Sequence, residues 1–320
     1  MVEDANAANS SIKEHINMNF LGESAAFATA ICWTLTGISF EQAGKRVGSF
    51  AVNLLRLIIA LLMMTIFNYI TRGTLIPMDA TPITWLWLSI SGLIGFVLGD
   101  LFLFQSYLLI GVRVAMVIMA SSPIFAALMG FVIFGERLTL LSFLGMLITL
   151  LGIALVVFLR SKGREDQETK KLTSLPLRGL FYAFIGAFGQ ASGLILSKLG
   201  MGADYSPLAA TQIRLMAGLA GFLVLYAIGN RWSEAKVALK NPGAMGFITM
   251  GAFFGPFMGV SFSLIAVQLT KAAIASTIMA LVPIMVIPFS IYLYKERVSF
   301  REIFGAVLTV TGVAVMVFGQ

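Results

Sequence analysis

Three charged side chains lie inside long apolar stretches of this chain and are the residues best placed to do chemistry there. Asp100 lies in the segment VLGDLFLF, and Arg56 and Arg214 begin the segments RLIIA and RLMAG. A carboxylate at the centre of a lipid bilayer costs on the order of 3 kcal/mol, so Asp100 requires a partner or a function. It could exchange protons or pair with an arginine, and either chemistry suits a gate or a proton-coupling site.

The depths of these charges indicate which of them can meet. At 1.5 Å per helical residue, Arg56 and Asp100 lie about 12 and 15 Å from the same expected membrane face. An Arg56–Asp100 ion pair is therefore possible, either as a structural element or as part of a gate. Arg214 is equivalent to Arg56, but Val260 stands where Asp100 would recur. We expect Arg214 either to reach headgroups and backbone carbonyls, or to face a cavity and attract an anionic substrate group such as a carboxylate.

Uncharged polar side chains in the apolar stretches add a weaker signal. Away from water they need partners, which are either neighbouring helices or a water-filled cavity. Trp33 and Gln190 fall at equivalent points of the two halves of the chain described below. Besides Arg214, the candidates for substrate binding are Trp33, Gln105, Ser121, Ser122 and Gln190.

Two prolines occupy matching places in apolar stretches that we expect to be helical. Pro123 in IMASSPI corresponds to Pro283 in IMALVPI. A proline inside a helix removes a backbone donor and kinks the helix. Matched kinks suit a bending gate, and they suit the shaping of helix packing equally well. Together with Asp100 and Arg56, both prolines are our candidates for gating or proton coupling.

The prolines belong to an internal repeat with a constant offset of 160 residues. GERLTLLSFLGMLITLLGIALVVF at 135–158 corresponds to KERVSFREIFGAVLTVTGVAVMVF at 295–318. Glycines, a Glu-Arg pair and a proline keep one register, which a biased apolar composition does not explain. Duplication within a membrane protein is typical of transporters built from repeats.

The composition and the lengths of the apolar stretches predict an all-α membrane protein. The chain has 320 residues, of which 58% are hydrophobic and 12% are charged. Stretches near the roughly 20 residues needed to cross a bilayer must form helices, because the backbone has no water to bond. We expect ten transmembrane helices, at 21–40, 48–70, 83–109, 112–134, 139–159, 177–198, 207–228, 243–268, 272–294 and 300–318.

The polar segments divide these helices into two groups of five. A polar tail at 1–19 precedes a first five-helix repeat at 20–159, and a charged linker at 160–176 leads to a second repeat at 177–320. Because each repeat has an odd number of helices, the second must enter the bilayer from the opposite face, so we expect inverted repeats. The positive-inside rule favours both termini outside a cell membrane, the plasma or inner membrane.

The last helix of each repeat carries small residues at matching positions. Glycine and threonine recur four and three residues apart, which places them on one helix face: Gly145, Thr149 and Gly152, then Gly305, Thr309 and Gly312. Such faces allow close helix contact. We expect helices 139–159 and 300–318 to pack with each other or with a second copy of the chain in a homodimer.

Several function classes are excluded. The single cysteine, Cys32, and the single histidine, His15, provide no metal cluster and no catalytic histidine in the apolar stretches. Neither a P-loop nor an HExxH motif is present, so we expect no enzyme, cofactor or metal. The net charge of +7 fits loop residues facing anionic membrane lipid, and we expect no nucleic-acid partner.

These features together resemble the EamA family of the drug/metabolite transporter superfamily. The resemblance rests on Trp33, on RLIIA and RLMAG, on the segments SSPIFAAL and LVPIMVIP, and on the turns GERLT and KERVS. It implies a central cavity between helices 1–4 and 6–9, and alternating access that exports amino acids or other small metabolites. In the small relatives of this superfamily, proton-coupled drug exporters use a glutamate in the middle of helix 1. Here Glu23 lies near the edge of that helix, so Asp100 is the better candidate for proton coupling. The alternative is a flippase or scramblase for a lipid or lipid-linked carrier.

Overall fold

The computed structural model describes residues 2–162, 176–282, 284–285 and 300–319, and every regular element in these ranges is a helix. The expectation of an all-helical chain is confirmed. The first half contains α1 (Val2–Val47), α2 (Ser49–Arg72), α3 (Pro82–Gly92), η1 (Leu93–Gly99), α4 (Asp100–Met119), α5 (Ser122–Phe134) and α6 (Leu140–Lys162). The second half contains α7 (Leu177–Met201), α8 (Pro207–Gly229), α9 (Trp232–Leu239), α10 (Pro242–Ala252), η3 (Phe253–Gly259), α11 (Val260–Leu269), α12 (Ala272–Met279) and α14 (Phe300–Phe318).

Five helical stretches in the described residues are long and apolar enough to cross a membrane. They are Ser49–Arg72, Pro82–Ser106, Leu177–Met201, Pro207–Gly229 and Pro242–Leu269. Three further apolar helices are shorter, namely Ser122–Phe134, Leu140–Leu155 and Ile303–Phe318. The structure thus agrees with a polytopic membrane protein, but the described residues do not establish the expected count of ten spans.

The boundary between the third and fourth expected spans is wrong. We expected separate spans at 83–109 and 112–134, yet α4 continues as one helix to Met119 and the chain turns at residues 120–121. A glycine and an arginine at 111–113 are tolerated inside a helix, whereas a proline is not. Pro123 accordingly lies in the first turn of α5. The N–H groups there have no partner within the helix, so the missing N–H of proline costs no hydrogen bond.

Pro123 therefore does not kink the middle of a helix, as the sequence suggested, but follows a break between two helices. A turn also follows α12 at residues 280–281, at the same offset of 160 residues. Pro283 lies outside the described residues.

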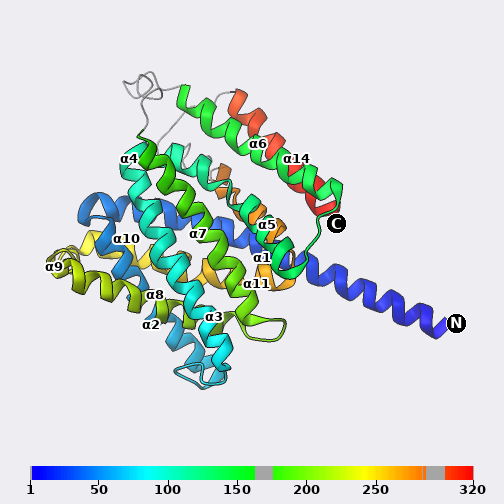
Figure 1. Cartoon of the computed structure of the whole chain (residues 1–320), viewed down its shortest axis with the longest axis horizontal. Helices are drawn as coiled ribbons and strands as arrows, with labels where there is room; N and C mark the ends of the chain where they lie inside the picture. The colour runs from blue at the N-terminus through cyan, green and yellow to red at the C-terminus, as the bar shows by residue number, and fades with distance from the viewer. Residues whose placement is uncertain (1, 163–175, 283, 286–299, 320) are drawn as a thin grey trace.

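The polar residues at 1–19 are helical from Val2 onward and continue without interruption into the first expected span, as α1 is a single helix from Val2 to Val47. Figure 1 shows its N-terminal part extending away from the other helices. Proline is absent from this segment and glycine first occurs at Gly22, so no residue with a strong preference against helix interrupts it.

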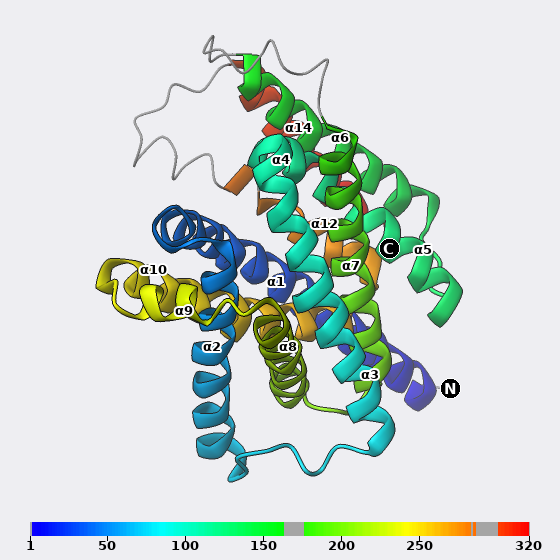
Figure 2. The ribbon, with the colours of Figure 1, turned by 60° about the vertical axis from the view of Figure 1, so that its left-hand side comes forward.

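Equivalent helices of the two halves make reciprocal contacts with the opposite half. The first helix of the first half, α1, lies against α10, η3 and α11, and the first helix of the second half, α7, lies against α3, η1 and α4. Figures 1 and 2 both show α7 running beside α3 and α4. Further pairs join α2 to α8, α5 to α12 and α6 to α14. Each half therefore completes the packing of the other.

The closest of these pairings joins α6 and α14, which lie side by side in Figure 1. A Cβ atom added at Gly145 would come within 2.4 Å of the backbone nitrogen of Met316, and one at Gly312 within 2.5 Å of that of Thr149. The two backbones thus meet where the sequence places small residues, as GxxxG-like contacts require. The helices pack with each other in one chain; the homodimer stays a prediction.

This packing predicts the cost of adding a single methyl group. We expect Gly312→Ala to lower the free energy of unfolding by about 1–3 kcal/mol, because the backbone of α6 has to move away. The measurement is thermal or denaturant unfolding in detergent micelles. Gly246→Ala is the matched control in α10, where an added Cβ atom meets nothing within 4 Å, and it should be neutral or stabilising by up to about 1 kcal/mol. Equal stability of the two variants would contradict the close contact.

Candidate functional site

A widened helical turn occurs at the same place in both halves. The π-helical segments η1, Leu93–Gly99, and η3, Phe253–Gly259, are offset by the same 160 residues as the sequence repeat. Each interrupts a long helix that continues on both sides. Single π turns inside α-helices are rare and frequently mark functional sites. The glycines of these two stretches did not indicate a change of helix type.

Asp100 is the first residue after η1, and both of its carboxylate oxygens have partners. Its side chain is buried, with Oδ2 in an ion pair with Nη2 of Arg56 from α2. Oδ1 accepts a hydrogen bond of 2.7 Å from Nε2 of Gln190 on α7. Asp100 thus binds one helix of its own half and one helix of the other half.

Arg214 is the second buried guanidinium of this region. Only 5% of the residue is exposed, and its guanidinium carbon lies 5.0 Å from the centre of the Phe96 ring in η1. It interacts electrostatically with Asp100, while its Nε has no hydrogen-bond partner. Arg214 is therefore enclosed by protein, and it lies beside the first widened turn.

Gly92 just before this turn and Gly95 within it allow α8 to come close. A Cβ atom at Gly92 would lie 2.4 Å from the carbonyl oxygen of Arg214, and one at Gly95 would lie 3.1 Å from its Nη2. A larger residue at either position would displace the arginine or its helix. The glycines at these two positions thus allow Arg214 to lie against η1.

Around Asp100 the described residues hold two buried guanidinium groups and one carboxylate. Arg56 is 6% exposed and Arg214 is 5% exposed, so neither charge is stabilised mainly by water. If all three groups are ionised, this cluster of Arg56, Asp100, Gln190 and Arg214 carries one net positive charge. We call it the central polar cluster.

The predicted site residues other than Arg56, Asp100, Gln190 and Arg214 lie outside this cluster. Trp33 packs against η3, because a Cβ atom at Gly259 would lie 2.8 Å from the indole Nε1. Gln190 occupies the corresponding place against η1, where a Cβ atom at Gly99 would lie 3.5 Å from its backbone nitrogen. The two residues predicted as equivalent thus each contact the widened turn of the opposite half.

The serines and Gln105 are not joined to the central polar cluster by any hydrogen bond within the described residues. Ser121 lies at the turn between α4 and α5, and its hydroxyl donates to the carbonyl of Ile118 at 2.6 Å. Ser122 begins α5 next to Pro123, and both Ser122 and Gln105 are half-buried.

A second polar network escaped the sequence analysis. Gln212, two residues before Arg214, accepts a hydrogen bond of 2.7 Å from Asn68 and donates to Thr65 and to the carbonyl of Leu75. This network joins α2 to α8 near the end of α2. Gln212 is a polar residue in an apolar stretch, but nothing in the sequence indicates which helix provides its hydrogen-bond partners.

The comparison with known families decides the class of protein. A family model described as the EamA-like transporter family matches residues 20–158 and again residues 177–318. This chain belongs to the EamA-like transporter family. Among the described residues, the first matched stretch of this EamA-like transporter contains the widened turn η1 and the second contains η3. The family consists of membrane transporters, in agreement with the sequence resemblance.

Two relatives of this EamA-like transporter extend the comparison. An uncharacterized transporter of Archaeoglobus fulgidus is 24% identical over 295 residues, which covers 91% of this chain and 96% of the relative. A crystal structure described only as that of a protein has a TM-score of 0.69 at 18% identity, covering 93% of this chain and 97% of the other. The second likeness shows the fold alone, and neither description names a substrate.

The ion pair in this EamA-like transporter predicts a characteristic pattern of stabilities. We expect Asp100→Leu alone to lower the free energy of unfolding by about 3 kcal/mol or more, because it leaves the Arg56 charge buried without its partner. The double variant Arg56→Leu with Asp100→Leu should be more stable than Asp100→Leu, since no charge of the pair remains. Unfolding of both single variants and the double variant in detergent completes the cycle. Additive losses would show that the pair contributes no coupling.

Proposed function

We propose that this chain is a secondary transporter that exports a small metabolite, such as an amino acid, by alternating access through a central cavity. The observation that carries the proposal is the central polar cluster, in which α2 and α4 of one repeat meet α7 and α8 of the other. Charged groups inside a membrane protein commonly mark the path of a substrate or of a coupling ion. Membership of a transporter family supports a path for substrate.

The arrangement of the halves supports alternating access. We propose that the repeats are inverted, with five spans each, in the cell membrane and with both termini outside. The exchange of equivalent contacts, α1 with α10–η3–α11 and α7 with α3–η1–α4, is what a pseudo-two-fold axis between repeats produces. Movement of one repeat against the other would then expose a shared site to each side in turn.

The charges of the central polar cluster favour an anionic group on the substrate. Asp100 already has Arg56 and Gln190 as partners, whereas Arg214 has a ring face and an unsatisfied Nε. A guanidinium binds a carboxylate through charge-assisted and often bidentate hydrogen bonds. We propose that Arg214 receives the substrate carboxylate, and that Trp33, Gln105, Ser121, Ser122 and Gln190 contribute to the rest of the path.

Asp100 is the proposed coupling group, with Arg56 as the cation that it releases or retains. A carboxylate held between an arginine and an amide can change partners when a proton arrives. Such a change would alter the contacts of α2 and α7, which come from different repeats. Proton arrival and movement of the repeats would thereby be linked.

Transport by the purified chain in proteoliposomes tests the function. We expect one or more small carboxylate-bearing metabolites in a panel to move, with a rate that saturates and that depends on an imposed pH gradient. Vesicles without protein are the control. If labelled lipid crosses the bilayer while no metabolite moves, the chain is a lipid flippase and the proposal is wrong.

Substitution of Arg214 tests the anionic substrate. We expect Arg214→Gln to raise the half-saturating concentration of a carboxylate substrate by about 10- to 100-fold, because a charge-assisted hydrogen bond is lost. Arg214→Lys should retain part of the affinity. Arg231→Gln is the matched control, since this exposed arginine follows the same helix α8. Wild-type affinity in Arg214→Gln would remove Arg214 from the binding site.

A further inference from the structure

The connection between α5 and α6 directs one carboxylate back into the protein. Gly135 ends α5 with a φ of 65°, in the left-handed region that glycine adopts readily. The backbone nitrogen of the next residue, Glu136, then donates to the carbonyl of Gly130 at 3.2 Å. The Glu136 carboxylate lies against Gly130, where an added Cβ atom would be 2.9 Å from Oε2. The Glu136 side chain is therefore positioned by a tight turn and a glycine face.

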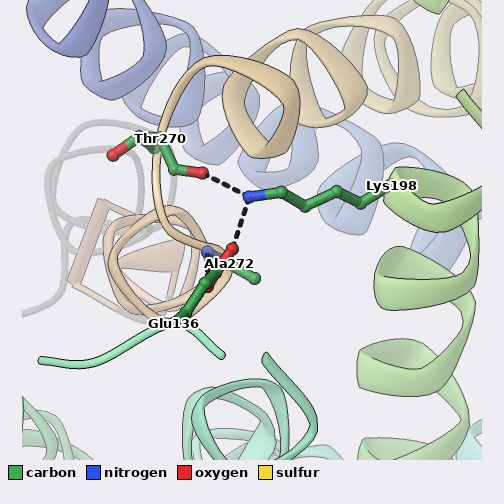
Figure 3. Close-up of polar contacts among 4 residues, drawn as sticks. All are labelled: Glu136, Lys198, Thr270 and Ala272. Carbon is green, nitrogen blue, oxygen red and sulfur yellow. Dashed lines mark hydrogen bonds and ion pairs between the residues drawn. The ribbon is translucent and has the colours of Figure 1, made fainter. Parts of the chain in front are cut away.

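Both oxygens of Glu136 are bound by the second repeat, as Figure 3 shows. Oε1 accepts a hydrogen bond of 2.5 Å from Nζ of Lys198, and Oε2 accepts one of 2.9 Å from the backbone nitrogen of Ala272. The Lys198 ammonium also donates to the carbonyl of Thr270 at 2.9 Å. The Glu136 and Lys198 side chains are only 13% and 18% exposed, so water screens the pair little.

These contacts join three segments that are far apart in the sequence. Glu136 follows α5 of the first repeat, Lys198 is in the last turn of α7, and Thr270 and Ala272 flank the break between α11 and α12. Six expected spans end at Lys198 and eight precede Lys271. Both numbers are even, so the two lysines lie on the same expected membrane face as the N-terminus. The contacts therefore connect the two repeats at one end of the molecule.

The backbone partners define which charge belongs at which position. The ammonium of Lys198 lies at the C-terminal carbonyl of α11, and the carboxylate of Glu136 lies at the first N–H of α12. A cation is favourable at the first kind of helix end and an anion at the second. An exchanged pair would set a carboxylate against a carbonyl and an ammonium against an N–H group.

The positions equivalent to Glu136 and Lys198 in the internal repeat do not form an acid–base pair. At the offset of 160 residues the position equivalent to Glu136 is Glu296, and at the offset of 157 residues that relates Trp33 to Gln190 the position equivalent to Lys198 is Glu41, so both are acids. Two carboxylates do not attract each other, so the pair is a property of one face of the chain.

We propose that Glu136 and Lys198 form a latch that holds the face bearing the termini closed, and that this latch must break when that face opens. The proposal rests on the alternating access proposed above. The contacts of the latch cross from one repeat to the other, so separation of the repeats at this end breaks these contacts first. The latch therefore sets the ratio of closed to open molecules at this face.

A distance measurement across the latch tests the proposal. Spin labels on Arg137→Cys and Asp204→Cys, both exposed, report the separation of the α5–α6 and α7–α8 connections in the full chain. The native thiol is removed by Cys32→Ala. In lipid nanodiscs, pulsed electron paramagnetic resonance should show one predominant short distance. E136Q or K198Q should shift the ratio of long to short distances at least about tenfold, because a charge-assisted bond is lost.

Matched variants separate the latch from general electrostatics. D79N breaks the exposed Arg72–Asp79 pair and should leave the distances unchanged, while K198R should retain most of the short distance. The exchange E136K with K198E should fail to restore the short distance, because the backbone partners then oppose both charges. If E136Q does not fold, E136D replaces it, since the shorter side chain keeps the charge but cannot reach all partners.

One result would overturn the latch, and another would overturn the role of its backbone partners. Unchanged distances in both E136Q and K198Q would show that the pair does not hold this face closed. Full restoration by the exchanged pair would show that the backbone partners do not matter. The distances are measured without substrate, so failure to find a transported metabolite would contradict the proposed function while leaving the latch to be judged by its own measurement.

Discussion

The buried carboxylate of Asp100 needs polar partners, and the rest of the structure depends on how it finds them. Asp100 lies inside a helix that is apolar on both sides of it, and its two oxygens are bound by Arg56 and Gln190. These partners come from different repeats, so the interaction that stabilises the charge also connects the two halves. Any movement of one half against the other has to preserve these bonds or replace them. Gly92, which precedes the widened turn η1, lets a further buried arginine, Arg214, approach closely.

Counting along helices was enough to predict several of these contacts. The matching depths of Arg56 and Asp100 indicated that the two could pair, and the structure brings them together. The small residues at Gly145 and Gly312 indicated a close contact between the last helices, and α6 and α14 make it. Both predictions use the regular rise and the face of a helix, which depend on sequence spacing alone.

Other features could not be predicted in this way, since they depend on how separate segments meet. Glu136 was recognised only as part of a repeated turn, and Lys198 only as a charge at the end of an apolar stretch. Their contact requires the left-handed turn at Gly135 and the break after α11 to come together in space. Likewise the sequence favoured a boundary at residues 110–111, between two expected spans, although helix α4 continues through it to Met119, because one glycine does not by itself interrupt a helix.

The widened turns at Leu93–Gly99 and Phe253–Gly259 have a consequence for how side chains are arranged around these helices. One extra residue in a turn rotates every later side chain by about 100° relative to a regular α-helix. A helical wheel drawn through the whole stretch therefore assigns Asp100 and the residues after it to the wrong side. Loss of one residue from such a turn would realign the stretch as a plain helix and carry the carboxylate a quarter of a circle or more away from Arg56 and Gln190. The length of this segment is thus constrained as strongly as its composition.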